Sequence, residues 1–148
     1  MQDYPHNYVV AASAQSDSNV TLASSGLSNL KSAAPAEFGG PGDQWSPETL
    51  LVAAVADCFI LSFKAIARAS NLDWTSLGCD VDGVLEKVDR VTQFTAFHIS
   101  ATLEIPESTR AEKAERLLAM AEKSCLITNS LIADSHLETE VRVAGLAA

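Results

Sequence analysis

One stretch of sequence decides the fold. Residues 45–58 read Trp45-Ser46-Pro47-Glu48-Thr49-Leu50-Leu51-Val52-Ala53-Ala54-Val55-Ala56-Asp57-Cys58. Ser46 can cap a helix, and Pro47 suits the first helical position because its missing N–H would be unpaired there anyway. Glu48 favours the positive end of a helix. The pattern predicts a long helix that begins here and runs to about Ser70, where Asn71 closes it.

Apolar residues go most of the way round this helix between Leu50 and Ile60. A helix of this kind is buried on nearly all sides, so in a small domain we expect a sheet, a neighbouring helix and a second subunit to cover it together. The segment from Leu50 to Ala67 also raises the question of a membrane span. Asp57 and Lys64 would each cost a few kcal/mol at the centre of a bilayer. We therefore expect a buried soluble helix and no membrane partner.

The region before this helix is rich in Ser, Ala and Asn and carries two short apolar segments. We predict short strands at Tyr8–Ala12 and Val20–Leu22, with turns near Gln15–Asn19 and Ser24–Gly26. The run Gly39–Gly42 predicts a loop that ends whatever precedes it.

The region after the helix changes to a period of two. Apolar and polar residues alternate from Phe97 to Ile105, which is typical of a strand with one face in water. Together with Gly78–Val88 this segment predicts a long antiparallel hairpin that turns near Asp89–Arg90. Pro106 should end it.

A second helix and a last strand complete the expected order. Thr109 and Glu112 match a capping box, and the helix that they begin should continue towards Cys125. Alternation predicts a final strand at about His136–Val143. This order of strands, helix, hairpin, helix and strand indicates an α+β fold and one domain spanning residues 1–148.

Composition limits the classes of function. The chain has 148 residues, of which 47% are hydrophobic and 20% charged, as in ordinary globular domains. Its formal charge of −9 makes nucleic acid an unfavourable partner, because phosphate binding needs a cationic face. Residues 1–7 contain no Lys or Arg and no long apolar run follows, so we expect a cytoplasmic protein.

Three cysteines, Cys58, Cys79 and Cys125, are the candidates for chemistry. They form no CxxC or zinc-type cluster, and in a reducing cytosol they should be thiols. A cysteine is often only a small buried hydrophobe, and Cys79 near a strand start is expected to be structural. Cys58 and Cys125 stand out by position, since one lies in the third turn of the long helix and the other where the second helix should end. Although 67 residues separate them, two helices packed on one sheet can bring them together.

No metal or nucleotide site is expected. The three histidines, His6, His98 and His136, lack metal-ligand spacing, and the chain contains no GxGxxG, P-loop or GxSxG motif. We expect no metal and no organic cofactor.

Two motifs carry a resemblance to a known family. Residues 45–58 resemble the central-helix motif of the OsmC/Ohr family, in which a Pro-Glu pair precedes the reactive cysteine by about ten residues. The segment Ser124-Cys125-Leu126-Ile127-Thr128-Asn129-Ser130 is similar to its second cysteine motif, in which Asn follows Cys by four residues. The resemblance implies an OsmC-like fold with antiparallel sheets around a buried central helix. It also implies an intertwined homodimer with active sites at the subunit interface.

The resemblance further implies a thiol peroxidase that reduces organic hydroperoxides. Cys58 would attack the peroxide and become a sulfenic acid, which Cys125 would convert to a Cys58–Cys125 disulfide. A dithiol reductant, either a lipoylated protein or a thioredoxin-like donor, would restore both thiols. The apolar neighbours Val55, Phe59 and Leu126 are the candidates to line a pocket for the alkyl part of the peroxide.

The family uses an arginine from the N-terminal region, held near the cysteine by the glutamate that Glu48 matches. Here no arginine precedes Arg68, and Lys31 is the only Lys or Arg in the first 63 residues. Lys31, Arg68 or an arginine of the partner subunit remain alternatives for the activating cation. Asp57 is a second departure, because a carboxylate beside Cys58 disfavours the thiolate if its side chain points the same way.

Two other functions stay open. The first is a non-catalytic dimer whose cavity binds a small apolar or thiol-bearing ligand, and the second is a redox sensor. The missing arginine and the presence of Asp57 favour the first of these.

Overall fold

The computed structural model of the chain describes residues 1–145. Contacts divide the chain into two compact units, Met1–Leu50 and Leu51–Ala148. Helix α1 (Pro47–Ala69) begins in the first unit and continues through the second. The two units are described separately.

The first unit contains a three-stranded antiparallel sheet in the order β1-β2-β3, followed by a short 3-10 helix. Its elements are β1 (Ala11–Ser13), β2 (Val20–Ala23), β3 (Leu30–Ser32) and η1 (Ala36–Phe38). The strand at Val20 is confirmed. The strand expected at Tyr8–Ala12 lies later in the chain, because Ala11 to Ser13 pair with Thr21 to Ala23 and the apolar residues before them remain exposed. The third strand was not predicted, since three residues reading Leu-Lys-Ser carry no usable periodicity.

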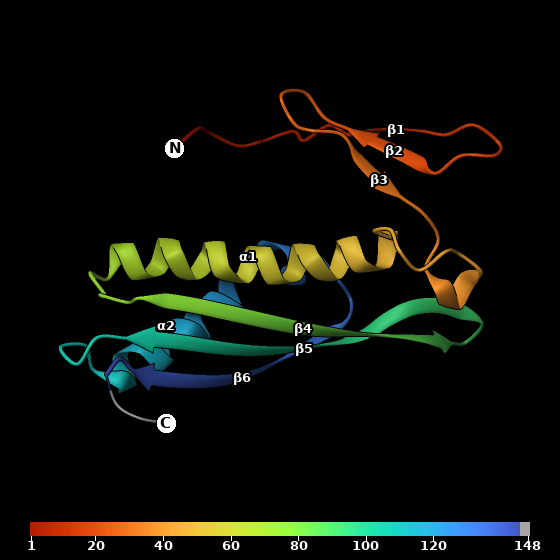
Figure 1. Cartoon of the computed structure of the whole chain (residues 1–148). Coiled ribbons are helices and arrows are strands. Elements are labelled where there is room, and N and C mark those ends of the chain that lie inside the picture. The colour runs from red at the N-terminus through yellow and green to blue at the C-terminus, as the bar shows by residue number, and fades with distance from the viewer. Residues whose placement is uncertain (146–148) are drawn as a thin grey trace. The chain divides into compact units, whose positions relative to one another are not determined.

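The second unit places two helices on one face of a three-stranded sheet, and Figure 1 shows α1 lying along this sheet. Its further elements are β4 (Ser76–Val88), β5 (Val91–Ile105), α2 (Ala111–Ser124), α3 (Leu126–Asn129) and β6 (Asp134–Val143). The core joins α1, the inward row of β5 and the apolar face of α2. Its largest fully buried side chains include Phe59, Phe63, Phe97, Ile99, Leu103 and Leu118.

Both ends of α1 agree with the sequence prediction. Thr49 N–H donates to Ser46 Oγ at 3.1 Å, and Ser46 N–H donates to Thr49 Oγ1 at 2.9 Å, so two free donors are satisfied reciprocally. At the other end Asn71 adopts a left-handed φ of 49°, and Leu72 N–H donates to the carbonyl of Ala67 at 2.9 Å. This hydrogen bond is typical of a helix closed by a left-handed residue.

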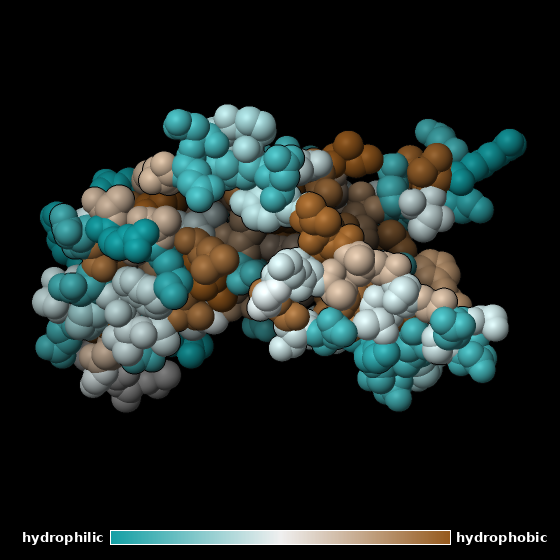
Figure 2. All heavy atoms as spheres, turned by 90° about the horizontal axis from the view of Figure 1, so that it is seen from above, coloured by the Kyte–Doolittle hydropathy of each residue, from teal (hydrophilic) through white to brown (hydrophobic). Residues whose placement is uncertain are grey.

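The prediction that α1 is buried on nearly all sides is wrong for a single chain. Only Val55, Phe59, Phe63 and Ala67 are buried, and these four lie on one face. On the opposite face Leu61 exposes 56% of its surface. In length and apolar composition α1 also resembles a membrane-spanning helix, as core helices of soluble proteins often do. Apolar side chains are also exposed elsewhere, and in the space-filling view of Figure 2 they form brown patches within the hydrophilic surface.

The long hairpin is confirmed with its turn at the predicted place. Strand β4 pairs with β5 from Ser76 to Val88, with one irregularity in register at Val84 and Leu85. Asp89 and Arg90 both have positive φ values, 48° and 71°. Two consecutive left-handed residues form the type of two-residue turn that matches the twist of a hairpin.

Two features of the C-terminal half differ from expectation. The α+β class holds, but β6 pairs with β5 in parallel, because α2 carries the chain back across the sheet before β6 begins. The capping box of Thr109 and Glu112 does not form, since Arg110 precedes α2 without a side-chain cap. Thr109 Oγ1 instead donates to the carbonyl of Asp73 at 2.9 Å and ties the start of α2 to the chain after α1.

Gly83 allows α1 to approach the sheet, which gives the first prediction. A methyl group added there would lie 2.7 Å from Val52 Cγ2 of α1 and 3.0 Å from Phe94 Cε1. We expect Gly83→Ala to lower the free energy of unfolding by about 1–3 kcal/mol, because the packed neighbours must move. Urea denaturation measures this loss. Gly78→Ala on the same strand is the control, since no atom lies within 4 Å of its added methyl group; equal losses for both variants would contradict the explanation.

Candidate active site

Cys58 lies in the third turn of α1 at the edge of the core. Its side chain is half-buried, while Val55 and Phe59 on either side of it in sequence are fully buried. Ser62, one turn further along the same face, places Oγ 3.9 Å from the Cys58 sulfur. The thiol therefore has one apolar flank and one weakly polar neighbour.

Cys125 lies at the junction between α2 and α3 and has no exposed surface. The chain bends here, because its ψ of 106° is extended while the residues on both sides are helical. The hydroxyl of Thr128 donates to the Cys125 carbonyl at 3.1 Å. Asn129, the residue that marks the second motif, donates from Nδ2 to the carbonyl of Lys123 at 3.1 Å and so spans the bend.

Cys58 and Cys125 are both free thiols, and they lie close enough for each to shift the pKa of the other. The backbone N–H of Ile127 lowers the pKa of both. Two helices on one face of the sheet thus bring together residues that are 67 positions apart.

The environment moves the two pKa values in opposite directions. Burial raises the pKa of Cys58, and the neighbouring Cys125 raises it further against the opposing effects of Ile127 N–H and Ser62. Burial also acts to raise the pKa of Cys125, but the N–H and hydroxyl of Thr128, together with Cys58, outweigh it and lower this pKa. Negative charge in the pair therefore favours Cys125.

Cys79 on β4 lies outside the pair. Burial and the nearby Asp80 raise the pKa of Cys79 to about 11. The residue packs against the core and stays protonated at neutral pH, which makes it a poor nucleophile.

Glu48 has a buried carboxylate oxygen without a partner. Among the described residues, nothing donates a hydrogen bond to its Oε2. The side chain lines a pocket of about 350 Å³ in the first unit, together with Val20, Ser32, Ala33, Ala34, Pro35, Phe38 and Pro47. A buried carboxylate oxygen of this kind needs a donor or a cation.

Glu48 and Cys58 of one chain do not meet. They are ten residues apart on the same helix, which corresponds to a rise of about 15 Å. Arg68 lies ten residues beyond Cys58 on α1 and is separated from it by a similar distance, so it does not activate Cys58 of its own chain. Lys31 is exposed in the first unit and donates from Nζ to Thr21 Oγ1 at 2.6 Å.

Asp57 does not act on the neighbouring thiol. Its side chain is exposed, and it is not among the groups that shift the pKa of Cys58. Successive helical residues point about 100° apart, so the side chains of Asp57 and Cys58 leave the helix in different directions.

The apolar residues predicted to line a pocket divide into two groups. Val55 and Phe59 have no exposed surface, so they pack in the core beneath Cys58 and do not offer a contact surface to a ligand. Leu126 exposes 66% of its surface beside Cys125 and remains available.

Sequence reasoning missed the polar groups around the sulfurs. The polar groups that lower the thiol pKa values belong to Ser62, Ile127 and Thr128. Two of them could have been found from their spacing to the cysteines in the sequence. Ser62 follows Cys58 by four positions, and Thr128 follows Cys125 by three, so each lies one helical turn away.

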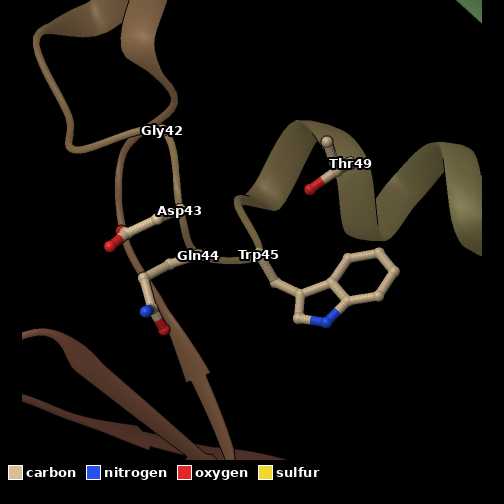
Figure 3. Close-up of a pocket in the computed structure, with 5 residues that line it drawn as sticks. All are labelled: Gly42, Asp43, Gln44, Trp45 and Thr49. Carbon is tan, nitrogen blue, oxygen red and sulfur yellow. The ribbon is translucent and has the colours of Figure 1, made fainter.

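A second pocket lies at the start of α1 in the first unit. It measures about 380 Å³ and is lined by Gly42, Asp43, Gln44, Trp45 and Thr49. In Figure 3 the Trp45 indole points away from Asp43 and Gln44 and lies beside the first turn of α1. Trp45 exposes 48% of its surface.

Comparison of the chain with known proteins identifies a matching family and a relative of similar sequence. The family model described as OsmC-like protein matches residues 40–140. The uncharacterized protein YmaD of Bacillus subtilis (strain 168) is 24% identical over 112 residues, which cover 74% of this chain and 75% of YmaD.

Solved structures share the fold. An OsmC-like protein of unknown function from Vibrio cholerae superposes with a TM-score of 0.82 at 19% identity, over 93% of this chain and 99% of that one. An organic hydroperoxide resistance protein OsmC from Legionella pneumophila gives a TM-score of 0.72 at 23% identity, over 94% and 100%. Another organic hydroperoxide resistance protein, from Elizabethkingia anophelis, gives 0.70 at 17% identity, over 97% and 100%.

Thr128 provides a test of the thiol electrostatics. We expect Thr128→Val to raise the pKa of Cys125, because the variant loses a hydroxyl that lowers it while the side-chain shape is kept. The titration of ¹³Cβ-labelled cysteine by NMR reports each thiol separately. Thr128→Ser, which keeps the hydroxyl, should leave the midpoint near that of the unmodified chain. An unchanged Cys125 midpoint in Thr128→Val would contradict this assignment.

Proposed function

Because the chain belongs to the OsmC-like protein family, we propose that it is a thiol-dependent peroxidase that reduces organic hydroperoxides. Cys58 is the thiol that attacks the peroxide, and Cys125 resolves the product. The observation that carries this proposal is the proximity of two free thiols, each of which shifts the pKa of the other. Two relatives of similar fold are named organic hydroperoxide resistance proteins, which supports the same class of substrate.

The reaction balances with two thiols and one hydroperoxide. The Cys58 thiolate attacks the terminal oxygen of ROOH, so an S–O bond forms as the O–O bond breaks and ROH leaves with a proton. The Cys125 sulfur then attacks the sulfur of the sulfenic acid, and water leaves as the disulfide forms. An external dithiol, from a lipoylated or thioredoxin-like protein of the cytoplasm, reduces the disulfide by exchange and becomes oxidised itself.

The two pKa directions suit these roles unequally. The lowered pKa of Cys125 supplies thiolate for the attack on the sulfenic acid. The raised pKa of Cys58 opposes the first step, because it lowers the fraction of thiolate at neutral pH. The proposed reaction therefore requires a cation near Cys58 that stabilises the thiolate. Within its own chain, Arg68 does not meet this requirement, because it lies ten residues beyond Cys58 on the same helix.

We propose a homodimer that completes the site. The outward face of α1 exposes apolar side chains, Leu61 above all, beside the charged Asp57, Lys64 and Arg68, and a second copy of the chain is a suitable cover. If two α1 helices pack antiparallel about residue 53, Glu48 of one subunit lies level with Cys58 of the other, although the two are about 15 Å apart within one chain. The unpaired oxygen of Glu48 then holds a cation, such as Lys31, at the shared site.

A non-catalytic binding protein is the second candidate. The raised pKa of Cys58 and the absence of an arginine before Arg68 favour it. Such a protein would use the same crevice for a small apolar or thiol-bearing ligand, and its thiols would not react with one equivalent of peroxide.

Peroxide chemistry separates the two candidates. With cumene hydroperoxide and dithiothreitol, we expect Cys58→Ser to lower turnover by about two orders of magnitude or more, since the nucleophile is lost. In Cys125→Ser, one equivalent of peroxide should leave a sulfenic acid at Cys58 that dimedone traps and mass spectrometry locates. Cys79→Ser is the matched control and should keep full activity. Wild-type turnover no faster than that of Cys58→Ser would support the binding protein instead.

Complementation between subunits tests the shared site. We expect Glu48→Ala and Cys58→Ser homodimers each to be almost inactive, because every site lacks one group. After the two are unfolded together and refolded, half the dimers are mixed and each carries one intact site, so about a quarter of the wild-type activity should return. A mixture that stays as inactive as its components would place Glu48 outside the site of the partner's Cys58.

A further inference from the structure

An unassigned pocket lies beside the last turns of α1. It measures about 410 Å³ and is lined by Leu61, Lys64, Ala65, Arg68, Leu72 and Trp74. The Trp74 ring forms one wall and is fixed by an edge-on contact with Phe63, with 5.5 Å between the ring centres. The pocket therefore combines apolar walls with two cationic side chains.

The two cations of this pocket have no carboxylate partner. Within residues 1–145 the one salt bridge joins Arg142 to Glu140, far along the sequence from α1. Lys64 and Arg68 are four residues apart on a helix, so their like charges lie on the same side and repel one another. A group that is apolar and presents negative potential would relieve this repulsion. The face of an aromatic ring has both properties.

Trp45 is a side chain of this kind and is available. It exposes 48% of its surface just before α1 begins. Asp43, two residues earlier, is the one charged residue of the loop segment 39–45 and adds negative charge near the indole. The loop and the pocket thus have opposite charges and matching apolar surfaces.

The proposed dimer makes this match reciprocal. Pairing Glu48 with Cys58 of the partner subunit centres the two antiparallel helices on residue 53. Residue 53 is also midway between Trp45 and Leu61. The same two-fold axis therefore brings Trp45 level with Leu61 of the partner subunit. Ala53 and Ala54 lie at this centre, where small side chains let two helices approach closely.

We propose that each subunit inserts the Trp45 indole into the pocket formed by Leu61, Lys64, Arg68 and Trp74 of the other. The inference rests on the proposed homodimer and adds the contact that sets its register. It assigns a role to an exposed tryptophan, an exposed leucine and two unpaired cations at once. A register centred between Ile60 and Leu61 is the alternative; it would pair Asp57 with Lys64 of the partner subunit but leave Trp45 in water.

Engineered thiols distinguish these registers without any use of peroxidase activity. In a Cys58→Ser, Cys79→Ser, Cys125→Ser background, we expect Trp45→Cys together with Leu61→Cys to form a covalent dimer on mild oxidation. Each single substitution should not, because two copies of residue 45 or of residue 61 lie about 24 Å apart in this register. Cross-linking by Leu61→Cys alone would establish the alternative register, and a dimer that the double variant fails to cross-link would overturn the inference while leaving the proposed function standing.

A second measurement keeps the natural cysteines in place. We expect Trp45→Ala to raise the dimer dissociation constant by at least about a hundredfold in sedimentation experiments, because two buried aromatic anchors are lost per dimer. Met120→Ala removes an equally exposed apolar side chain from α2 and should leave the constant within about threefold. Equal effects of the two substitutions would contradict a specific role for Trp45, and a wild-type chain that is monomeric would overturn both the dimer and the inference.

Discussion

One chain cannot cover both sides of α1. The helix is apolar around most of its circumference, yet the sheet and α2 bury only the face that carries Val55, Phe59, Phe63 and Ala67. Burying an apolar side chain contributes roughly 1.5–3 kcal/mol, and Leu61 on the other face forgoes this stabilisation while it stays in water. Cys58 lies at the border between the buried and the open face of α1, so the uncovered face also affects the chemistry of this thiol. A thiol at this border contacts the core of its own chain and lies next to whatever covers the open face.

The electrostatics of the thiol pair follow from where each sulfur lies. Cys125 occupies a bend between two helices, where the N–H and hydroxyl of Thr128 and the N–H of Ile127 lower its pKa. Cys58 lies within a continuous helix, whose own N–H groups already donate to the preceding turn. A bend therefore offers donors that a regular helix does not. This difference accounts for the opposite directions of the two pKa values better than burial does, because burial acts to raise both.

Sequence reasoning was most successful where local chemistry decides the structure. The start of α1 at Ser46, its end at Asn71 and the turn at Asp89 and Arg90 follow from caps and left-handed residues, and the structure confirms them. It failed where distant partners decide. Thr109 has the residue type of a cap but donates to Asp73, and the parallel placement of β6 depends on the path of α2. For the site, the position of Cys58 and Cys125 on two helices predicted that packing can bring them together, whereas the burial of Val55 and Phe59 required knowledge of which helix face meets the sheet.

The parallel placement of β6 has a consequence for biosynthesis. The hairpin of β4 and β5 can form as soon as β5 leaves the ribosome, but its inner row of Phe97, Ile99 and Leu103 then has no third strand beside it. That strand is made only after α2, since β6 follows it in the chain. During synthesis the edge of β5 is therefore open to pairing with other nascent chains, a period in which aggregation competes with folding. Chains truncated before Asp134 should inherit this open edge permanently.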